Sequence, residues 1–312
     1  MEKQTGQSDN YKIVPYHNGL IDDFYALYQS VHKQLLAKEH FLTKGNTSFT
    51  GQPIIGFIAY ERLTNQVAAF YGVYPVLVNL NGQWVLAAQS GDTLTHGNHR
   101  RRGLWEKLVE LTKDECKNRA IQFIFGFPNS SSTPGFKKFG WPFYPNKKNF
   151  YFRRERNFIE KIKNRIFPDM AFKLLNHKFV GSEKISSLGF QSDVMRTDSY
   201  FSYKNKLSGA RFYQINSCVI WAKVEPNTIV IGDVQANDNT SMAAIAKELA
   251  QLPSILNLCN LYFSLSHFNP LIAELQKIPG MSVSESEFVV WPLSNLSGFE
   301  NFRYSSVDDD TF

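Results

Sequence analysis

Cysteine is scarce in this sequence, and long hydrophobic runs are missing. The chain of 312 residues has three cysteines, Cys116, Cys218 and Cys259, which are widely spaced and form no CxxC pair. This pattern argues against a disulfide framework or a cysteine zinc site, and it favours a reducing compartment. The polar start of the chain lacks the apolar core of a signal peptide, and no apolar run approaches the ~18 residues of a membrane helix. We therefore expect a cytoplasmic protein with no membrane segment and no metal.

The length and composition of the chain indicate two packed domains. At roughly 150 residues per domain, the length predicts about two domains. Hydrophobic residues make up 43% of the chain and charged residues 20%. This composition supplies enough apolar side chains for packed cores and leaves little room for bulk disorder.

The net charge of +6 comes from one segment near the middle of the chain. Residues 147–165 contain eight lysines or arginines and two glutamates, a balance of +6 that leaves 26 basic and 26 acidic residues elsewhere. Basic stretches bind phosphate backbones in some proteins, but a run of charge at a domain junction is more often a solvated face. We therefore favour the solvated face and do not expect a nucleic-acid partner.

The first half of the chain alternates short strands with amphipathic helices. Apolar residues recur at helical spacing over 20–38 and again over 103–119. Segments rich in β-branched and aromatic residues, joined by tight polar turns, predict strands over 53–62, 67–78 and 83–94. A further apolar run at 121–127 has the length of a buried strand. This pattern indicates an α+β fold with a mixed, mostly antiparallel sheet and flanking helices.

The second half of the chain repeats this layout more faintly. The expected strands cover 219–224, 228–234, 258–265 and 283–291, and the expected helices cover 241–251 and 270–277. A shift of 140 residues places Asn129 on Asn269 and Gly140 on Gly280. A repeat near half the chain length favours a duplicated domain over a solenoid.

Residues 95–103 join a predicted strand to a predicted helix and are rich in basic side chains. They read Thr-His-Gly-Asn-His-Arg-Arg-Arg-Gly. The first turn of a helix has unpaired N–H groups and the positive end of the helix dipole, and a glycine there lets a phosphate approach the backbone. From these residues alone, an anion site and an exposed arginine-rich turn are equally good interpretations.

The spacing within this loop favours the anion site. Arg100-x-x-Gly103 resembles the acyl-CoA pyrophosphate loop of the GNAT superfamily of N-acyltransferases, which reads Gln/Arg-x-x-Gly-x-Gly/Ala. Downstream, GFPNSSSTPGFKKFGW resembles the GNAT segment that runs from the fifth strand through a short helix to the sixth strand. Residues 89–94 resemble the fourth GNAT strand. The resemblance covers roughly residues 10–155, so we expect domains at 1–155 and 156–312.

The resemblance implies acetyl-CoA as the co-substrate and a set of residues that bind it. These residues are Thr93, Leu94, Arg100, Arg101, Arg102, Gly103, Leu104, Trp105, Asn129 and Ser132. Two positions depart from the GNAT pattern. Trp105 stands where the loop has Gly or Ala, which is compatible with binding through the backbone if the indole points into the core. Phe136 stands where many GNAT enzymes place a proton-donating tyrosine, and phenylalanine has no proton to give.

The same resemblance suggests candidates for the proton transfers. Asp92 is the only carboxylate on the expected fourth strand, where a base acting directly or through water belongs. The alternative for Asp92 is a strand-end residue that satisfies a turn. His96 and His99 are other possible bases, because imidazole titrates near neutral pH. Tyr144 is a possible acid in place of Phe136.

The second half retains the expected scaffold without the binding residues. Thr240 and Ala243 replace Arg100 and Gly103 at the shift of 140. We therefore expect tandem GNAT-like domains with a degenerate second copy, and one CoA per chain.

The leading functional hypothesis is an N-acetyltransferase, of a style seen in bacterial proteins, that acts on the primary amine of a small molecule or amino sugar. One alternative is an aminoacyl-tRNA-dependent transferase of tandem GNAT-like fold. The other is a non-catalytic CoA-binding scaffold. The sequence leaves the oligomeric state open.

Overall fold

The computed structural model describes residues 10–33, 35–160, 193–216, 218–236 and 240–309. The chain divides into two compact units. The first comprises Met1–Val78, Gly82–Pro142 and Val289–Ser297, and the second comprises Asn79–Asn81, Phe143–Phe288 and Gly298–Phe312. The sequence analysis placed one junction at residue 155, whereas these units change at residue 142 and exchange a short segment near the C-terminal end of the chain.

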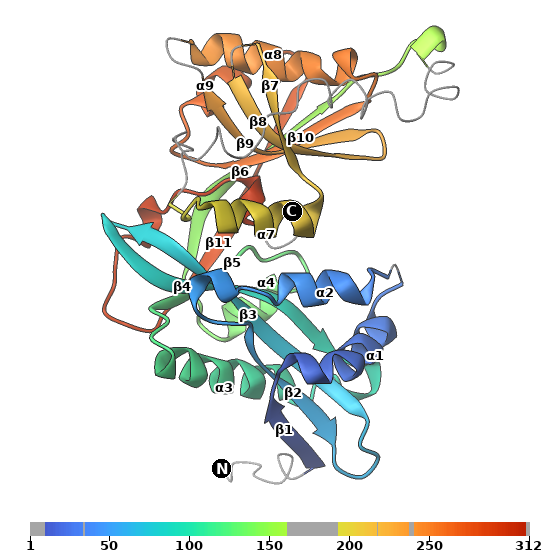
Figure 1. The fold of residues 1–312 in the computed structure, drawn as a ribbon, viewed down its shortest axis with the longest axis vertical. Helices are drawn as coiled ribbons and strands as arrows, with labels where there is room; N and C mark the ends of the chain where they lie inside the picture. The colour runs from blue at the N-terminus through green and yellow to red at the C-terminus, as the bar shows by residue number, and fades with distance from the viewer. Residues whose placement is uncertain (1–9, 34, 161–192, 217, 237–239, 310–312) are drawn as a thin grey trace. The chain divides into compact units, whose positions relative to one another are not determined.

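The first unit contains a strand meander and flanking helices (Figure 1). Two of these helices lie in the sequence between the first and second strands, a third lies between the fourth and fifth strands, and a fourth follows the fifth strand. Its strands are β1 (Tyr11–Pro15), β2 (Ile55–Glu61), β3 (Val67–Leu80), β4 (Gln83–Thr95) and β5 (Phe123–Gly126). Its helices are α1 (Ile21–Val31), α2 (Lys38–Lys44), α3 (Leu104–Asn118) and α4 (Thr133–Lys138), with short 3-10 turns η2 (Asn18–Leu20), η3 (Ser48–Thr50) and η4 (Gly97–His99). The strands lie side by side in the order β1-β2-β3-β4-β5.

Apolar side chains explain how the helices pack in this unit. Phe24 and Leu27 of α1 and Phe41 of α2 are buried in one cluster with Ile58 and Phe70 of the sheet. Removing such side chains from water stabilises the unit by roughly 25 cal/mol per Å² of apolar surface.

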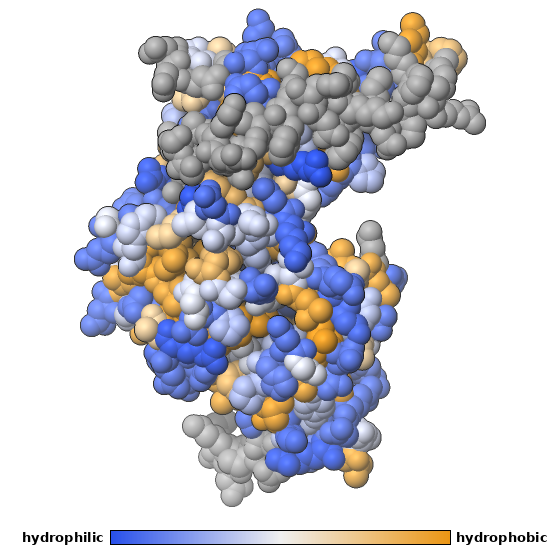
Figure 2. Space-filling model, in the orientation of Figure 1, coloured by the Kyte–Doolittle hydropathy of each residue, from blue (hydrophilic) through white to orange (hydrophobic). Residues whose placement is uncertain are grey.

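Helix α3 is amphipathic, as predicted. It buries Leu104 and Leu108 and exposes Glu106, Lys107 and Glu110. Figure 2 shows hydrophilic side chains over this helix.

The strands β4 and β5 are parallel and pair over a short stretch. Ala88 lies opposite Ile124, and Gln89 lies opposite Phe125. β4 then runs on to Thr95, whereas β5 ends at Gly126. The last residues of β4 therefore extend beyond the stretch that pairs with β5, and they lead directly into the basic loop.

The second unit follows a similar order of elements. Its strands lie in the order β11-β6-β10-β9-β8-β7. They are β6 (Phe143–Arg153), β7 (Arg211–Ile215), β8 (Cys218–Glu225), β9 (Thr228–Ala236), β10 (Asn260–Ser266) and β11 (Met281–Pro292). The helices are α7 (Asp198–Ser208), α8 (Met242–Ile255) and α9 (Leu271–Leu275), with 3-10 turns η6 (Phe299–Asn301) and η7 (Ser306–Asp308).

The two units share a pattern of connections. In each, antiparallel strands lead to a long helix, which leads to a strand parallel to the last strand of the meander: β4 to β5 in the first unit and β9 to β10 in the second. The predicted α+β class with a mixed, mostly antiparallel sheet is confirmed. The origin of the second unit as a degenerate GNAT-like copy stays a prediction.

The helix predicted over 20–38 is shorter, because α1 ends at Val31 and His32 has extended backbone angles. A separate helix, α2, follows it and was not predicted.

The basic segment is largely paired within the described residues. Four of its basic side chains have a partner there: Lys147 with Asp309, Lys148 with Glu285, Arg154 with Glu160, and Arg156 with the carbonyl oxygen of Asn257. Lys161, Lys163 and Arg165 lie outside the described residues.

Candidate functional site

The loop between β4 and α3 has a backbone that leaves the start of the helix open. Gly103 is the N-cap of α3 and has a φ of +71°, in the left-handed region that glycine adopts at little cost. No side chain caps the helix at this residue. The first N–H groups of α3 therefore have no intrahelical acceptor and no capping side chain, and they carry the positive end of the helix dipole.

A hollow of about 220 Å³ opens at this end of α3. Its lining includes Thr95 at the end of β4, the segment 100–103, and Lys138 of α4. Arg100, Arg101 and Arg102 are exposed. A hollow with open amides and several cations is suited to a multiply charged anion such as a pyrophosphate.

Trp105 lies against α4. Its ring is 4.8 Å from that of Phe139 and 5.5 Å from that of Phe136, measured between centroids. A Cβ atom on Gly135 would lie 1.9 Å from the indole, so the glycine supplies the space that this side chain occupies. The structure thus shows how a bulky residue is accommodated at the loop position where the GNAT pattern has Gly or Ala.

Phe136 belongs to the same aromatic cluster. It is buried, and its ring centroid is 4.9 Å from that of Trp141. The side chain at this position therefore packs in the interior of the first unit and has an evident structural role.

Asn129 and Ser132 form the turn that precedes α4. The Asn129 side-chain oxygen accepts hydrogen bonds from the backbone N–H groups of Ser131 and Ser132, at 2.9 and 3.0 Å. The Ser132 hydroxyl accepts one from the backbone of Asn129, at 3.0 Å. Both side chains are thus engaged in local structure, and the predicted contact of either with CoA stays a prediction.

Thr93 and Leu94 occupy the end of β4 ahead of the loop. Leu94 is buried in the cluster beneath α1, whereas Thr93 is exposed. The side chain of Leu94 is therefore part of the core, and the contact of the Thr93 and Leu94 backbones with CoA stays a prediction.

Asp92 lies at the centre of a polar group that α2, β3 and β4 bring together. Lys44 donates to its Oδ2 atom at 3.1 Å, and the Tyr74 hydroxyl donates to the same oxygen. The side chain of Lys44 is 5% exposed and that of Asp92 is 18% exposed. The Lys44 ammonium also lies 4.8 Å from the centre of the Tyr74 ring.

These partners decide the charge of Asp92. Burial by itself raises the pKa of Asp92, but the Lys44 charge, the hydrogen bonds from Tyr74 and Lys44, and the charge of His40 outweigh it and lower the pKa below its ordinary value. Asp92 is therefore a stable anion at neutral pH and a weak base. Burial and the negative charge of Asp92 raise the pKa of nearby Tyr16 to about 12.

The two histidines of the loop have different surroundings. His96 accepts a hydrogen bond from the backbone of Asn98 at 3.3 Å. His99 is buried, and its Nδ1 atom is 3.0 Å from the Tyr11 hydroxyl. Burial is the main cause that lowers the pKa of His99, so this imidazole is neutral at physiological pH.

Tyr144 lies on β6 in the second unit. Its ring packs against those of Phe288 and Phe299, with centroids 6.1 and 6.4 Å away. Burial, followed by the charge of Glu300, raises the pKa of Tyr144. Asp92 and Tyr144 therefore belong to different units, and the role of Tyr144 as the acid stays a prediction.

Sequence reasoning missed Lys44 and Tyr74. Both are separated from Asp92 by many residues, and only the packing of α2 and β3 brings them to it. No local pattern singles out either residue, since Lys44 lies in the largely polar stretch 38–45.

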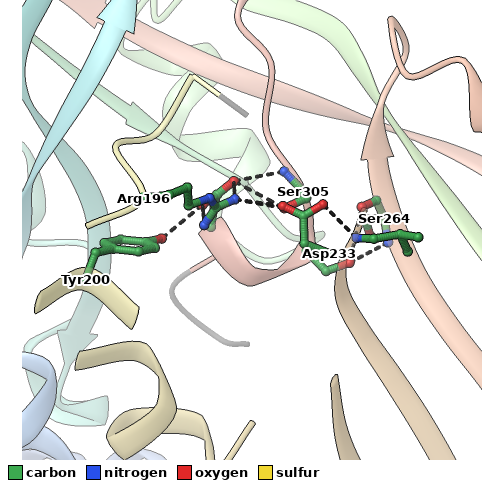
Figure 3. A network of polar contacts seen from close by, with 8 residues as sticks. Arg196, Tyr200, Asp233, Ser264 and Ser305 are labelled. Carbon is green, nitrogen blue, oxygen red and sulfur yellow. Dashed lines mark hydrogen bonds and ion pairs between the residues drawn. The ribbon is translucent and has the colours of Figure 1, made fainter. Parts of the chain in front are cut away.

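A second polar cluster lies inside the second unit (Figure 3). The Nη2 atom of Arg196 lies 3.0 Å from Oδ2 of Asp233, and its Nη1 atom lies 2.7 Å from Oδ1 of Asp308. The Ser305 hydroxyl donates to Oδ2 of Asp233 at 2.9 Å. Tyr200 donates to Asp308 at 2.9 Å. These groups are largely buried and pair with one another, which is typical of an internal anchor for the segment around Ser305.

No group of three or more His, Cys, Asp or Glu side chains in the described part of the chain is arranged to hold a metal ion. None of its helices combines the length and apolar character needed to span a bilayer.

Comparisons with known proteins agree with the fold described above, an α+β domain with an open helix start beside two parallel strands. The family model described as an acetyltransferase (GNAT) domain matches residues 15–144. The chain therefore contains a GNAT acetyltransferase domain over these residues. None of the curated proteins matches the sequence.

Solved structures share the fold over most of the chain. A probable N-acyltransferase from Enterococcus faecalis V583 has a TM-score of 0.58 at 12% identity and covers 91% of this chain and 73% of its own. A putative acetyltransferase from Pyrococcus horikoshii has a TM-score of 0.54 at 15% identity, covering 97% and 96%. A glucosamine N-acetyltransferase region of a fungal multi-domain β-N-acetylglucosaminidase has a TM-score of 0.55 at 9% identity, covering 90% and 38%. At these identities the likeness is one of fold.

Proposed function

We propose that this protein transfers an acetyl group from acetyl-CoA directly to the primary amine of a small molecule or amino sugar. The observation that carries the proposal is the uncapped start of α3, where Gly103 and three exposed arginines face a hollow of about 220 Å³. The GNAT match over residues 15–144 supports the same reaction class.

The first unit has the parts that binding requires. The open N–H groups of α3 and the charges of Arg100 and Arg102 would hold the pyrophosphate of acetyl-CoA. The backbone of Thr93 and Leu94, at the end of β4, would hold the pantetheine arm. The end of β4 and the start of α3 are joined by one short loop. Binding of the pyrophosphate at α3 would therefore fix where the pantetheine arm, and with it the thioester, lies along β4.

The chemistry then needs little from the protein. The neutral amine attacks the thioester carbonyl, the tetrahedral oxyanion collapses, and the C–S bond breaks to release the CoA thiolate. The amine loses its proton, and the thiolate takes one from water or from an acid. A thiol of pKa about 8.5 is a fair leaving group without assistance, so the phenylalanine at position 136 is compatible with turnover. Asp92, a stable anion on β4, would accept a hydrogen bond from the acceptor amine.

Thiol release from acetyl-CoA, assayed with a panel of amines, tests the proposal. The panel includes glucosamine, because one structure of the same fold is described as a glucosamine N-acetyltransferase region. We expect amine-dependent thiol release, and a rise of about tenfold or more in the KM for the amine in Asp92→Asn, with CoA affinity nearly unchanged. CoA binding without thiol release for any amine would contradict the proposal.

CoA binding without thiol release would support a non-catalytic CoA-binding scaffold. The observation that favours this alternative is Phe136, which has no hydroxyl to protonate the CoA thiolate. The aminoacyl-tRNA alternative is tested separately. Reversing the charges of Arg153, Arg154 and Arg156 should leave turnover within a few-fold, because Arg154 and Arg156 are already engaged with Glu160 and the Asn257 backbone.

A further inference from the structure

We propose that Lys44 is a positioning residue, which together with Tyr74 fixes one oxygen of Asp92 so that the other oxygen receives the amine of the acceptor. This inference rests on the function proposed above. It adds two residues to the site and gives Asp92 the role of an anchor for the acceptor, rather than that of a base.

The carboxylate of Asp92 is held at one of its two oxygens. Both Lys44 and Tyr74 donate to Oδ2 of Asp92. Within the described residues, no hydrogen bond reaches the other oxygen, Oδ1. The Asp92 side chain is 18% exposed, so the carboxylate is not sealed in the core. One oxygen is held from two directions and the second remains able to accept a hydrogen bond.

Burying the Lys44 ammonium costs free energy, which its neighbours offset. The Lys44 side chain is 5% exposed, and burying an ammonium requires close compensation by an anion and by neighbouring groups. Asp92 supplies the anion, and the face of the Tyr74 ring supplies a favourable surface for the cation at 4.8 Å. Lys44 is therefore held in place, and its contact with Oδ2 restricts the orientation of the Asp92 carboxylate.

The surroundings of Asp92 also decide its protonation state. The groups that face Asp92 are Lys44 and His40 on α2, Tyr74 on β3, and Tyr16 after β1. Their combined effect keeps Asp92 ionised, and such a carboxylate accepts a proton from an ammonium poorly. It binds an amine well through a charge-assisted hydrogen bond. The acceptor amine then reacts as its free base, and its proton passes to solvent.

The test compares two lysines of the same helix. Lys44→Met removes the charge that holds Asp92, whereas Lys38→Met removes an exposed lysine paired with Asp22. For Lys44→Met we expect the KM for the amine to rise by about tenfold or more, and the acidic limb of the kcat/KM profile to move to higher pH. CoA affinity should stay within about twofold, and Lys38→Met should match the wild type. Lys44→Arg, which keeps the charge, should restore most of the amine affinity.

The outcomes separate this inference from the proposed function. A wild type that releases no thiol with any amine would overturn both. An active wild type, with a Lys44→Met variant that keeps the amine KM and the pH profile, would overturn the inference alone. If Lys44→Met fails to fold, Tyr74→Phe removes one hydrogen bond to the same oxygen. It should raise the amine KM and move the acidic limb in the same direction, and a Tyr74→Phe profile identical to that of the wild type would then overturn the inference.

Discussion

The contact between Trp105 and Gly135 links the predicted CoA loop to α4. The sequence has an indole where the GNAT loop has a small residue, and it has a glycine at the helix position that the indole covers. A Cβ atom at Gly135 would lie 1.9 Å from the ring. The small residue that makes room in this region is therefore Gly135 on α4, whereas in the GNAT pattern the small residue is in the loop itself.

Gly135→Ala should lower the melting temperature of the protein and weaken CoA binding. In a helix this substitution ordinarily stabilises by ~1 kcal/mol, but here the new methyl group displaces Trp105, and overpacking of this kind costs ~1–3 kcal/mol. Thermal unfolding and calorimetry with CoA measure the two effects. In a Trp105→Ala background the same substitution should be neutral or stabilising. A Gly135→Ala protein more stable than the wild type would show that the contact is not tight.

Asp233 in the second unit should make stability depend on pH. Burial raises the pKa of Asp233 to about 6, and the charge of Arg196 only partly opposes this effect. The folded state thus holds a proton that the unfolded state, with an ordinary pKa near 3.8, has already lost. The free energy of unfolding should therefore fall as the pH rises from about 4 to 6, by on the order of 1–3 kcal/mol from this group, and stay level above that range.

Asp233→Asn removes this titration and keeps the acceptor for Ser305. Denaturant unfolding at a series of pH values should show a smaller fall between pH 4 and 6 in the variant than in the wild type. Equal slopes in the two proteins would mean that Asp233 is ionised throughout.

At the scale of elements, the two long helices that connect parallel strands begin differently. Helix α8 is capped by Ser241, whose hydroxyl accepts a hydrogen bond from the backbone of Ala244 at 3.2 Å. Helix α3 begins at Gly103 with no side-chain cap. The first amides of α8 are partly satisfied by the Ser241 side chain, whereas those of α3 have no capping side chain.

Ser241→Ala should therefore destabilise the protein by ~1 kcal/mol, the usual cost of a lost N-cap, and should leave CoA affinity unchanged. Chemical denaturation gives the first value and calorimetry the second. A loss of CoA affinity in this variant would place a binding site at α8.

The elements that could be predicted from the sequence are those with a local signal. The amphipathic spacing of α3, the polar turns between β2, β3 and β4, and the spacing from Arg100 to Gly103 all lie within short stretches of chain. Lys44 could not be predicted as part of the site, because its partner Asp92 is distant in the sequence and α2 is too short to show a clear period. The aromatic contacts of Phe136 and the position of Tyr144 in the second unit depend equally on packing that no local pattern encodes.

At the scale of the whole molecule, β11 belongs to both units. Residues 281–288 are part of the second unit, and residues 289–297 complete the first. In the first unit, Val290 lies opposite Phe125 of β5, and the Trp291 ring lies 3.3 Å from the Lys113 ammonium of α3. Residues 289–297, near the far end of the sequence, therefore belong to the same unit as residues 1–78, and the expected boundary at residue 155 stays a prediction.

The central claim is that each chain binds one CoA, at the start of α3. Calorimetric titration of the protein with CoA measures the stoichiometry directly, and two glycine variants locate the site. Gly103 and Gly209 both have a φ of +71° and open space where a Cβ atom would be, so Gly103→Val and Gly209→Val carry the same backbone strain. We predict one site per chain in the wild type and in Gly209→Val, and no binding in Gly103→Val, because a branched side chain would occupy the place of the phosphate. Two sites per chain, or binding that survives Gly103→Val, would contradict the account.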